Sequence, residues 1–258
     1  MLGAIAGDII GSAHEFGLTK TKDFPLLGPE CDFTDDTVMT VAIAQAILTD
    51  GDYRRAALDF GRRYPGRGYG GSFQQWLASP DPRPYGSYGN GAAMRASPVG
   101  FAFSSVDEVL REAEHSAVFS HDHPEGVKGA QAAALAVFLA RTTRDKALVR
   151  TEIASRFGYD LDRTVDEIRP AYGHVESCQE TVPEAVISFL ESTSYEDAVR
   201  NAVSLGGDAD TLACIAGGIA EAFYGPVPPS ILAGVRRRLA PELWDIVERF
   251  YRAFRSPF

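Results

Sequence analysis

The sequence predicts an all-α fold, and three observations support this prediction. Apolar residues recur at helical spacing along almost the whole chain, and the alternation typical of strands is scarce. One segment, residues 127–140, is apolar on nearly every side, as expected for a helix in the middle of a bundle. With 258 residues, 45% of them hydrophobic, the chain can bury one sizeable core without other support. We therefore expect a compact orthogonal helix bundle that forms one domain over residues 1–258.

Glycines at helical spacing mark the first segment. Gly3, Gly7 and Gly11 lie four residues apart, so on a helix they share one face, where a second helix could approach closely. Glu15 continues this stripe and would face inward, which is a costly place for an unpaired carboxylate. The alternative for Glu15 is a solvated helix end, and Asp8 on the same segment could equally be structural.

Residues typical of helix N-termini predict where several further helices begin. Ser105 and Glu108 have the spacing of a capping box that opens a helix over residues 106–117. A weaker version, Ser194 with Asp197, precedes residues 198–205. The last helix carries Pro241 in its first turn and one wide apolar stripe, formed by Leu243, Val247, Phe250 and Phe254.

Stretches rich in Gly and Pro separate the helical runs at residues 64–71, 79–91 and 224–229. Loops of this length in a compact helical domain are more often functional than accidental. The best candidate for a strand is the alternation of Val99, Phe101 and Phe103.

The charge balance excludes some classes of partner. Lys and Arg number 25 and Asp and Glu number 35, so the formal net charge is −10, which argues against non-specific nucleic-acid binding and against docking on anionic membranes. The longest apolar windows, 132–140 and 212–220, fall short of the ~20 residues that cross a bilayer. Residues 1–11 lack a basic leader and contain Asp8, so we expect no signal peptide. Three cysteines without paired spacing fit a reducing cytoplasm, and we expect a cytoplasmic protein.

Two acidic clusters stand directly before predicted helices. Thr34-Asp35-Asp36-Thr37 precedes residues 38–48, and Gly206-Gly207-Asp208-Ala209-Asp210-Thr211 precedes residues 212–223. Capping would explain one such cluster, because Asp and Thr accept hydrogen bonds from free N–H groups at a helix start. Two clusters, each with more acidic side chains than a cap needs, indicate hard divalent cations such as Mg²⁺ or Mn²⁺ that neutralise the adjacent charges. The glycine pair would let Asp208 and Asp210 converge, and the two helix starts together could hold two ions.

Three further motifs are weaker. The glycine-rich run 86–91 could cradle a phosphate or a ribose through backbone N–H groups, or form an ordinary turn. The run His121-Asp122-His123-Pro124 could be a polar helix start. The pair Asp208 and Asp210 is similar to the Asp-x-Asp of haloacid-dehalogenase-type phosphatases, but those enzymes need a parallel sheet, and here Thr211 comes one place early.

Taken in order along the chain, these motifs resemble the ADP-ribosylglycohydrolase family. The resemblance spans residues 3–225 and rests on these runs: Gly7-Asp8, Gly11-Ser12 and Glu15; Thr34-Asp35-Asp36-Thr37; Ser87-Tyr88-Gly89-Asn90-Gly91-Ala92-Ala93-Met94-Arg95; His121 with His123-Pro124; and Gly206-Gly207-Asp208-Ala209-Asp210-Thr211. It implies an all-helical metalloenzyme with two Mg²⁺ or Mn²⁺ ions in a cleft, which removes ADP-ribose from modified side chains of the arginine or serine type. The implied partner is an ADP-ribosylated protein or a small molecule that contains ADP-ribose.

The resemblance also implies roles for individual residues. The metal ligands would be Thr34, Asp35, Asp36, Asp208, Asp210 and Thr211. Ser87, Tyr88, Gly89 and Asn90 would form a loop that contacts the diphosphate and distal ribose, and either His121 or His123 would contact substrate. Glu15 would lie near the metals and contact the substrate ribose.

Cleavage of a ribosyl bond develops positive charge on the sugar, and a carboxylate must take a proton from the attacking water. Glu15, Asp35 and Asp36 are the candidates for this catalytic base. Two alternatives remain: a catalytically silent relative that binds ADP-ribose or serves a structural purpose, and a metal-dependent phosphatase.

Overall fold

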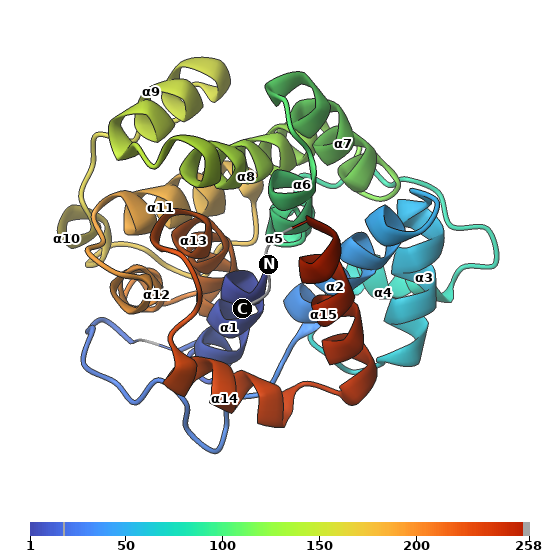
Figure 1. The fold of residues 1–258 in the computed structure, drawn as a ribbon, viewed down its shortest axis with the longest axis horizontal. Helices are drawn as coiled ribbons and strands as arrows, with labels where there is room; N and C mark the ends of the chain where they lie inside the picture. The colour runs from blue at the N-terminus through green and yellow to red at the C-terminus, as the bar shows by residue number, and fades with distance from the viewer. Residues whose placement is uncertain (18, 255–258) are drawn as a thin grey trace.

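The computed structural model describes residues 1–17 and 19–254, and within these ranges the chain forms fifteen α-helices and no named strand (Figure 1). This confirms the predicted all-α class. The helices are α1 Leu2–Ser12, α2 Asp35–Leu48, α3 Tyr53–Arg63, α4 Gly71–Ala78, α5 Gly91–Met94, α6 Ser97–Ala102, α7 Val106–Val118, α8 Pro124–Thr143, α9 Lys146–Phe157, α10 Val165–Ile168, α11 Cys178–Leu190, α12 Tyr195–Val203, α13 Ala209–Tyr224, α14 Pro229–Arg238 and α15 Pro241–Phe254.

The glycine stripe of α1 packs directly against α13 (Figure 1). A Cβ atom at Gly7 would lie 2.0 Å from the Ala213 carbonyl oxygen, and one at Gly3 would lie 2.3 Å from that of Gly217. At Gly11 the nearest atom would be the Asp210 Cα, 2.4 Å away. Only glycine therefore permits this approach, which brings the C-terminal end of α1 against the start of α13.

The apolar segment predicted for the middle of the bundle is α8, and it is buried along most of its length. It packs against α6, α7, α11 and α13, and its run from Ala132 to Ala140 is almost entirely inaccessible. Its twenty residues begin at Pro124, which suits the first helical position because proline lacks an N–H to leave unpaired. The prediction from the sequence is confirmed here.

The predicted helix starts at Ser105 and Ser194 are also confirmed. Ser105 and Glu108 form a complete capping box at the start of α7. Ser194 accepts a hydrogen bond from the Asp197 backbone, so α12 begins three residues earlier than the sequence suggested.

The alternation at Val99, Phe101 and Phe103 does not form a strand, so that prediction is wrong. Residues 97–102 form the short helix α6, with Pro98 near its start. A Cβ atom at Gly100 would lie 2.4 Å from the Ala134 carbonyl oxygen, so α6 packs closely against α8. A short helix that is buried on all sides has no polar face. Its sequence then lacks the helical spacing of polar residues that would distinguish it from the alternating pattern of a strand.

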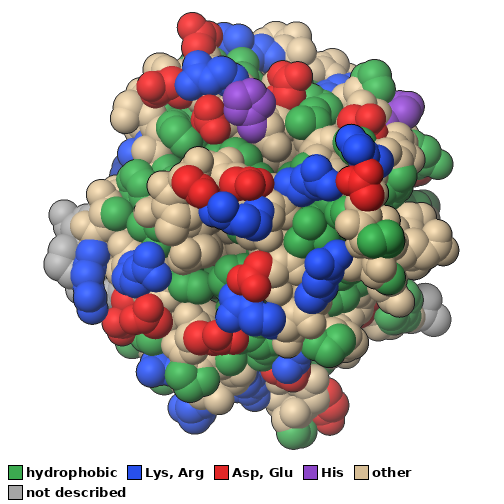
Figure 2. Space-filling model, turned by 90° about the vertical axis from the view of Figure 1, so that its right-hand side faces the viewer, with side chains coloured by type: hydrophobic (Ala, Val, Ile, Leu, Met, Phe, Trp, Pro, Cys, Tyr) green, Lys and Arg blue, Asp and Glu red, His purple; other side chains and the backbone are tan. Residues whose placement is uncertain are grey.

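Cationic and anionic side chains are interspersed on the face shown in Figure 2, without a broad region of one sign. Ion pairs between exposed side chains include those of Arg63 with Asp59 and Glu242. Among the described residues, no helix is long and apolar enough to cross a membrane.

Candidate metal centre and substrate pocket

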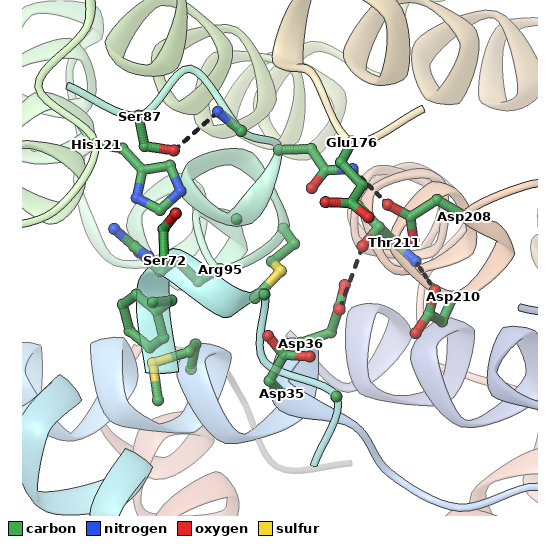
Figure 3. A pocket seen from close by; sticks show the side chains of 18 of the residues that line it. Asp35, Asp36, Ser72, Ser87, Arg95, His121, Glu176, Asp208, Asp210 and Thr211 are labelled. Atoms are coloured by element: carbon green, nitrogen blue, oxygen red, sulfur yellow. Dashed lines mark hydrogen bonds between the residues drawn. The ribbon is translucent and has the colours of Figure 1, made fainter. Parts of the chain in front are cut away.

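The two acidic helix starts meet in space. Asp35 and Asp36 occupy the first turn of α2. Asp208 holds the position just before α13, without a capping hydrogen bond from its side chain, and Asp210 lies in the first turn of that helix. The Thr211 hydroxyl donates to Asp36 Oδ2 over 3.3 Å, which joins segments 175 residues apart (Figure 3). The expected juxtaposition of the two clusters is confirmed.

Left-handed glycines shape the second of these turns. Gly206 and Gly207 have φ angles of +73° and +71°, a region that side chains with a Cβ atom rarely adopt. A Cβ atom at Gly207 would lie only 2.3 Å from the Gly173 carbonyl oxygen. The glycine pair therefore gives the chain the tight turn that brings Asp208 and Asp210 to one side of the pocket, as the sequence suggested.

Asp8, which the sequence left undecided, lies beneath the first cluster and is completely buried. Its carboxylate accepts hydrogen bonds from the backbone N–H and hydroxyl groups of both Thr34 and Thr37. Asp8 thereby holds the first turn of α2 against α1. These partners lie 26 and 29 residues along the chain, so no local pattern pointed to them.

Carboxylate oxygens of Asp8, Asp36 and Asp210 lie within 4.8 Å of one another, and all three residues are buried. Burial and the negative charge of Asp8, Asp35 and Asp208 hold the pKa of Asp36 well above its usual range. Burial, together with Asp208 and Asp36, does the same for the pKa of Asp210. Burial raises the pKa of Asp8 to about 6.

This donor set fits a hard divalent cation. Asp36 Oδ1 is buried and has no hydrogen-bond partner among the described residues. An unpartnered carboxylate oxygen in a crowded anionic cluster is unfavourable unless a proton or a cation neutralises it. Oxygen ligands from carboxylates and hydroxyls are those that Mg²⁺ and Mn²⁺ prefer.

Asn90 contacts the second cluster directly. Its side-chain amide donates to Asp208 Oδ2 over 2.7 Å and to the Thr181 hydroxyl over 3.1 Å. The residue is buried, at 7% exposure, at the start of α5. Asn90 thus fixes the orientation of Asp208, a relation that its assignment to the substrate loop did not anticipate.

A cavity of about 230 Å³ opens above the acidic cluster (Figure 3). Among its lining residues are several of the predicted site residues: Glu15, Asp35, Asp36, Ser87, Gly89, Asn90, His121, Asp208, Asp210 and Thr211. Thr34 lies beneath the cluster, where its hydroxyl donates to Asp8 Oδ1 over 2.7 Å. Tyr88 is 52% exposed, outside the cavity lining, with its ring 5.4 Å from that of His123.

Glu15 lines the cavity, but it is not on a helix as the glycine stripe suggested. Helix α1 ends at Ser12, and the chain turns so that the Phe16 N–H donates to the Gly207 carbonyl. Burial and the nearby charge of Asp208 raise the pKa of Glu15 to about 7. Its carboxylate accepts no hydrogen bond from residues 1–17 or 19–254, so it remains available to a ligand or a proton.

The two histidines of the run 121–124 have different surroundings. His121 is 5% exposed and lines the cavity, while His123 is exposed and caps α8 by accepting from the Glu125 backbone. Of the two histidines, His121 is the one that lines the cavity.

Sequence reasoning missed several residues of the cavity, among them residues that carry a charge or an aromatic ring. Arg95 was part of a motif, but nothing indicated that its guanidinium would be 1% exposed and line the cavity. Phe16, at a φ of +58°, and His174 also line the cavity, with their ring centroids 4.8 Å apart and the rings tilted. His174 also pairs with Glu176 over 3.0 Å. Residues 174 and 176 follow no recognisable motif, so only tertiary structure could place them.

Fold and site together define an all-helical protein in which two acidic helix starts form the floor of a cavity. The sequence profile of the ADP-ribosylglycohydrolase family matches residues 1–257. The chain is 28% identical to ADP-ribosylhydrolase ARH3 of Danio rerio, over all of this chain and 90% of the relative. It is 29% identical to ADP-ribosylhydrolase ARH3 of Homo sapiens, over 87% of this chain and 84% of the relative.

Two further relatives widen the comparison. ADP-ribosylarginine hydrolase Tri1 of Pseudomonas putida is 26% identical over 95% of this chain and 76% of its own length. A solved structure titled ADP-ribosylglycohydrolase-related protein complex superposes with a TM-score of 0.75 at 26% identity, covering 98% of this chain and 95% of that one. The chain belongs to the ADP-ribosylglycohydrolase family and is an ADP-ribosylhydrolase, an enzyme that hydrolyses glycosidic bonds.

The haloacid-dehalogenase interpretation of Asp208 and Asp210 is excluded. That class needs a parallel sheet, and the described part of the chain contains only one isolated bridge, between Gly89 and Ser177.

Proposed function

We propose that this protein is a divalent-metal-dependent hydrolase that releases ADP-ribose from mono-ADP-ribosylated side chains of the arginine or serine type. The observation that carries the proposal is the meeting of the α2 and α13 starts beneath one cavity, where Asp36 Oδ1 is buried without a hydrogen-bond partner among the described residues. A neutral ligand would leave the repulsion among these carboxylates unrelieved, whereas cations relieve it.

We assign two Mg²⁺ or Mn²⁺ ions to Thr34, Asp35, Asp36, Asp208, Asp210 and Thr211. Divalent cations of this type, when bound, polarise water and orient oxygen ligands such as ribose hydroxyls. They also let an acidic protein accept an anionic substrate. Asp8 supports this set from below, because its bonds to Thr34 and Thr37 fix the turn that carries Asp35 and Asp36.

Protein side chains supply the proton transfer and the orientation of the sugar. Glu15 is the carboxylate best placed to accept a proton from the attacking water, because it lines the cavity and its pKa of about 7 suits a base near neutrality. Asp35 and Asp36 remain candidates as well, since they also line the cavity. The surrounding carboxylates favour the positive charge that develops on the sugar ring as the glycosidic bond breaks.

The remaining assignments concern the rest of the substrate. The loop from Ser87 to Asn90 would contact the diphosphate and distal ribose, and His121 would contact the same part of the ligand. We expect the working environment to be the reducing cytoplasm, because the three cysteines are free and buried.

A direct test measures bound divalent metal and the release of free ADP-ribose over time from defined arginine- and serine-linked peptides. We expect release that stops with a chelator and returns with Mg²⁺ or Mn²⁺. The matched control for an Asp210→Asn variant is Asp59→Asn, which removes an exposed carboxylate in an ion pair with Arg63. Binding of ADP-ribose without any release would instead identify a silent relative, and release that persists without metal would overturn the metal assignment.

A further inference from the structure

His121 lies at a wall of the cavity, and hydrogen bonds on the side away from the cavity fix its position. Its backbone N–H donates to the Ala117 carbonyl over 2.9 Å, just after the end of α7. Its Nε2 atom faces the glycine loop, since a Cβ atom at Gly91 would lie 3.1 Å from it and one at Gly89 would lie 3.5 Å away. Figure 3 shows the ring beside Ser87, within the group of side chains that line the cavity. No residue in the described ranges forms a hydrogen bond with Nε2.

The other ring nitrogen ends a chain of buried hydrogen bonds. Arg95 Nη2 donates to the Ser120 hydroxyl over 3.0 Å, and that hydroxyl lies 2.8 Å from His121 Nδ1. Arg95 is itself fixed, because Nε donates to the Ser116 carbonyl over 3.1 Å and the guanidinium lies 4.4 Å from the Phe119 ring centre. Arg95, Ser120 and His121 are all buried.

The direction of these bonds follows from the chemistry of the groups. A guanidinium has only donors, so the Ser120 oxygen must accept from Arg95. The Ser120 proton has no other acceptor among the described residues than His121 Nδ1. If Nδ1 carried a proton, this buried hydroxyl would be left without an acceptor, so the arrangement that satisfies every donor has Nδ1 accepting through its lone pair. A neutral imidazole with an unprotonated Nδ1 carries its proton on Nε2. Burial and the positive charge of Arg95 also keep the pKa of His121 well below its usual value, so the ring stays neutral.

We propose that Arg95 and Ser120 are positioning residues that hold His121 as the neutral Nε2–H tautomer, so that this ring enters the cavity only as a hydrogen-bond donor. Nε2 then has no lone pair for a substrate proton, and Nδ1 is already engaged with Ser120. His121 is therefore excluded as the base and is suited to an acceptor oxygen of the ligand, a phosphoryl or hydroxyl oxygen. This second part rests on the proposed function, whereas the tautomer is a property of the free protein.

The test combines nitrogen-15 NMR of the histidine side chains with binding of ADP-ribose. The chain has only five histidines, so His121→Gln identifies the resonances by their loss. We expect His121 in the free wild-type protein to show an unprotonated Nδ1 and a protonated Nε2. In Ser120→Ala the fixed pattern should be replaced by a mixture of tautomers, because Nδ1 loses its donor.

The matched control is Ser116→Ala. Ser116 is as buried as Ser120, but its hydroxyl donates to the Ala113 carbonyl and takes no part in the contact with His121. By calorimetry we expect Ser120→Ala to bind ADP-ribose roughly threefold to tenfold more weakly, the range for one lost neutral hydrogen bond, while Ser116→Ala binds as wild type does. KM for the peptide substrate should rise in Ser120→Ala while kcat stays close to the wild-type value.

A proton on Nδ1 of the wild-type protein would overturn the proposal, and so would an unchanged affinity in Ser120→Ala. The NMR result on the wild-type protein decides the tautomer even if Ser120→Ala fails to fold. If the wild-type protein neither binds nor releases ADP-ribose, the proposed function fails, while the tautomer is still decided by the spectrum of the free protein.

Discussion

Replacing Gly7 with alanine tests how closely α1 and α13 must approach to build the centre. A Cβ atom at this position would lie 2.0 Å from the Ala213 carbonyl oxygen and 2.9 Å from the Cys214 nitrogen. Ordinary contact begins near 3.4 Å, so the helices would have to separate locally by roughly 1.4 Å. Both obstructing atoms belong to the backbone, and no change of side-chain rotamer can relieve the clash.

The energetic cost follows from two opposing effects. Overpacking of a well-packed interior typically lowers the free energy of unfolding by about 1–3 kcal/mol, and we expect Gly7→Ala to reach the upper end of this range because the obstructing atoms are rigid backbone. The higher helix propensity of alanine offsets about 1 kcal/mol of this loss. We therefore expect the free energy of unfolding to fall by roughly 2 kcal/mol. Metal affinity should fall as well, because a shift of α1 displaces Asp8 from Thr34 and Thr37.

Urea unfolding followed by tryptophan fluorescence measures this change, since Trp76 is 3% exposed in the folded protein. Gly218→Ala is the matched control on the facing helix α13. A Cβ atom there would lie 3.2 Å from Ser97 Cβ and 3.4 Å from Ala4 Cβ, so only small adjustments are needed. We expect Gly218→Ala to unfold within about 1 kcal/mol of wild type. Equal stability of the Gly7 and Gly218 variants would refute the reasoning.

Three further predictions concern the acidic centre. Asp210→Asn should weaken metal binding measured by calorimetry and lower turnover together, and an unchanged metal affinity would remove Asp210 from the ligand set. Glu15→Gln should leave the metal content unchanged while the release of ADP-ribose falls, because Glu15 lies outside the buried group of Asp8, Asp36 and Asp210; wild-type rates would make it structural. In the protein freed of metal by a chelator, the raised pKa of Asp8 contributes to the free energy of unfolding at low pH. This contribution is fully present below pH 3.8 and is lost as the pH rises through about 6. On acidification from about pH 7.5 to about pH 5, the free energy of unfolding of wild type should therefore rise by roughly 1.4 kcal/mol more than that of Asp8→Asn. Urea unfolding at the two pH values measures this difference, and an equal change in both proteins would contradict the raised pKa of Asp8.

Much of the fold could be predicted because its signals are local. The capping box at Ser105 and the continuous burial of α8 depend on neighbouring residues alone. The end of α1 could not be predicted in this way. The glycine stripe runs on to Glu15, but the helix stops at Ser12, where a hydrogen bond from Phe16 to Gly207 draws the chain across to the second cluster. A contact between positions 191 residues apart overrode the local periodicity.

The candidate site shows the same division. The meeting of the two acidic turns could be inferred, because unneutralised carboxylates at two helix starts need a common partner. The role of Asp8 could not, since a buried aspartate looks the same in sequence whether it caps a helix or fixes a distant turn. The linkage from Arg95 through Ser120 to His121 was equally hidden, because its meaning depends on which atom donates in three dimensions.

Close packing and unbalanced charge are connected at the centre. The glycine contacts between α1 and α13 hold Asp8 and Asp210 where their carboxylates cannot move apart to relieve repulsion. Because the backbone is fixed, the charge must be neutralised in place, by protons or by cations. Both would bind the same oxygens of Asp36 and its neighbours, so they compete. Metal affinity should therefore fall as the pH is lowered through the raised pKa values of these groups, and proton release should accompany metal binding near neutrality.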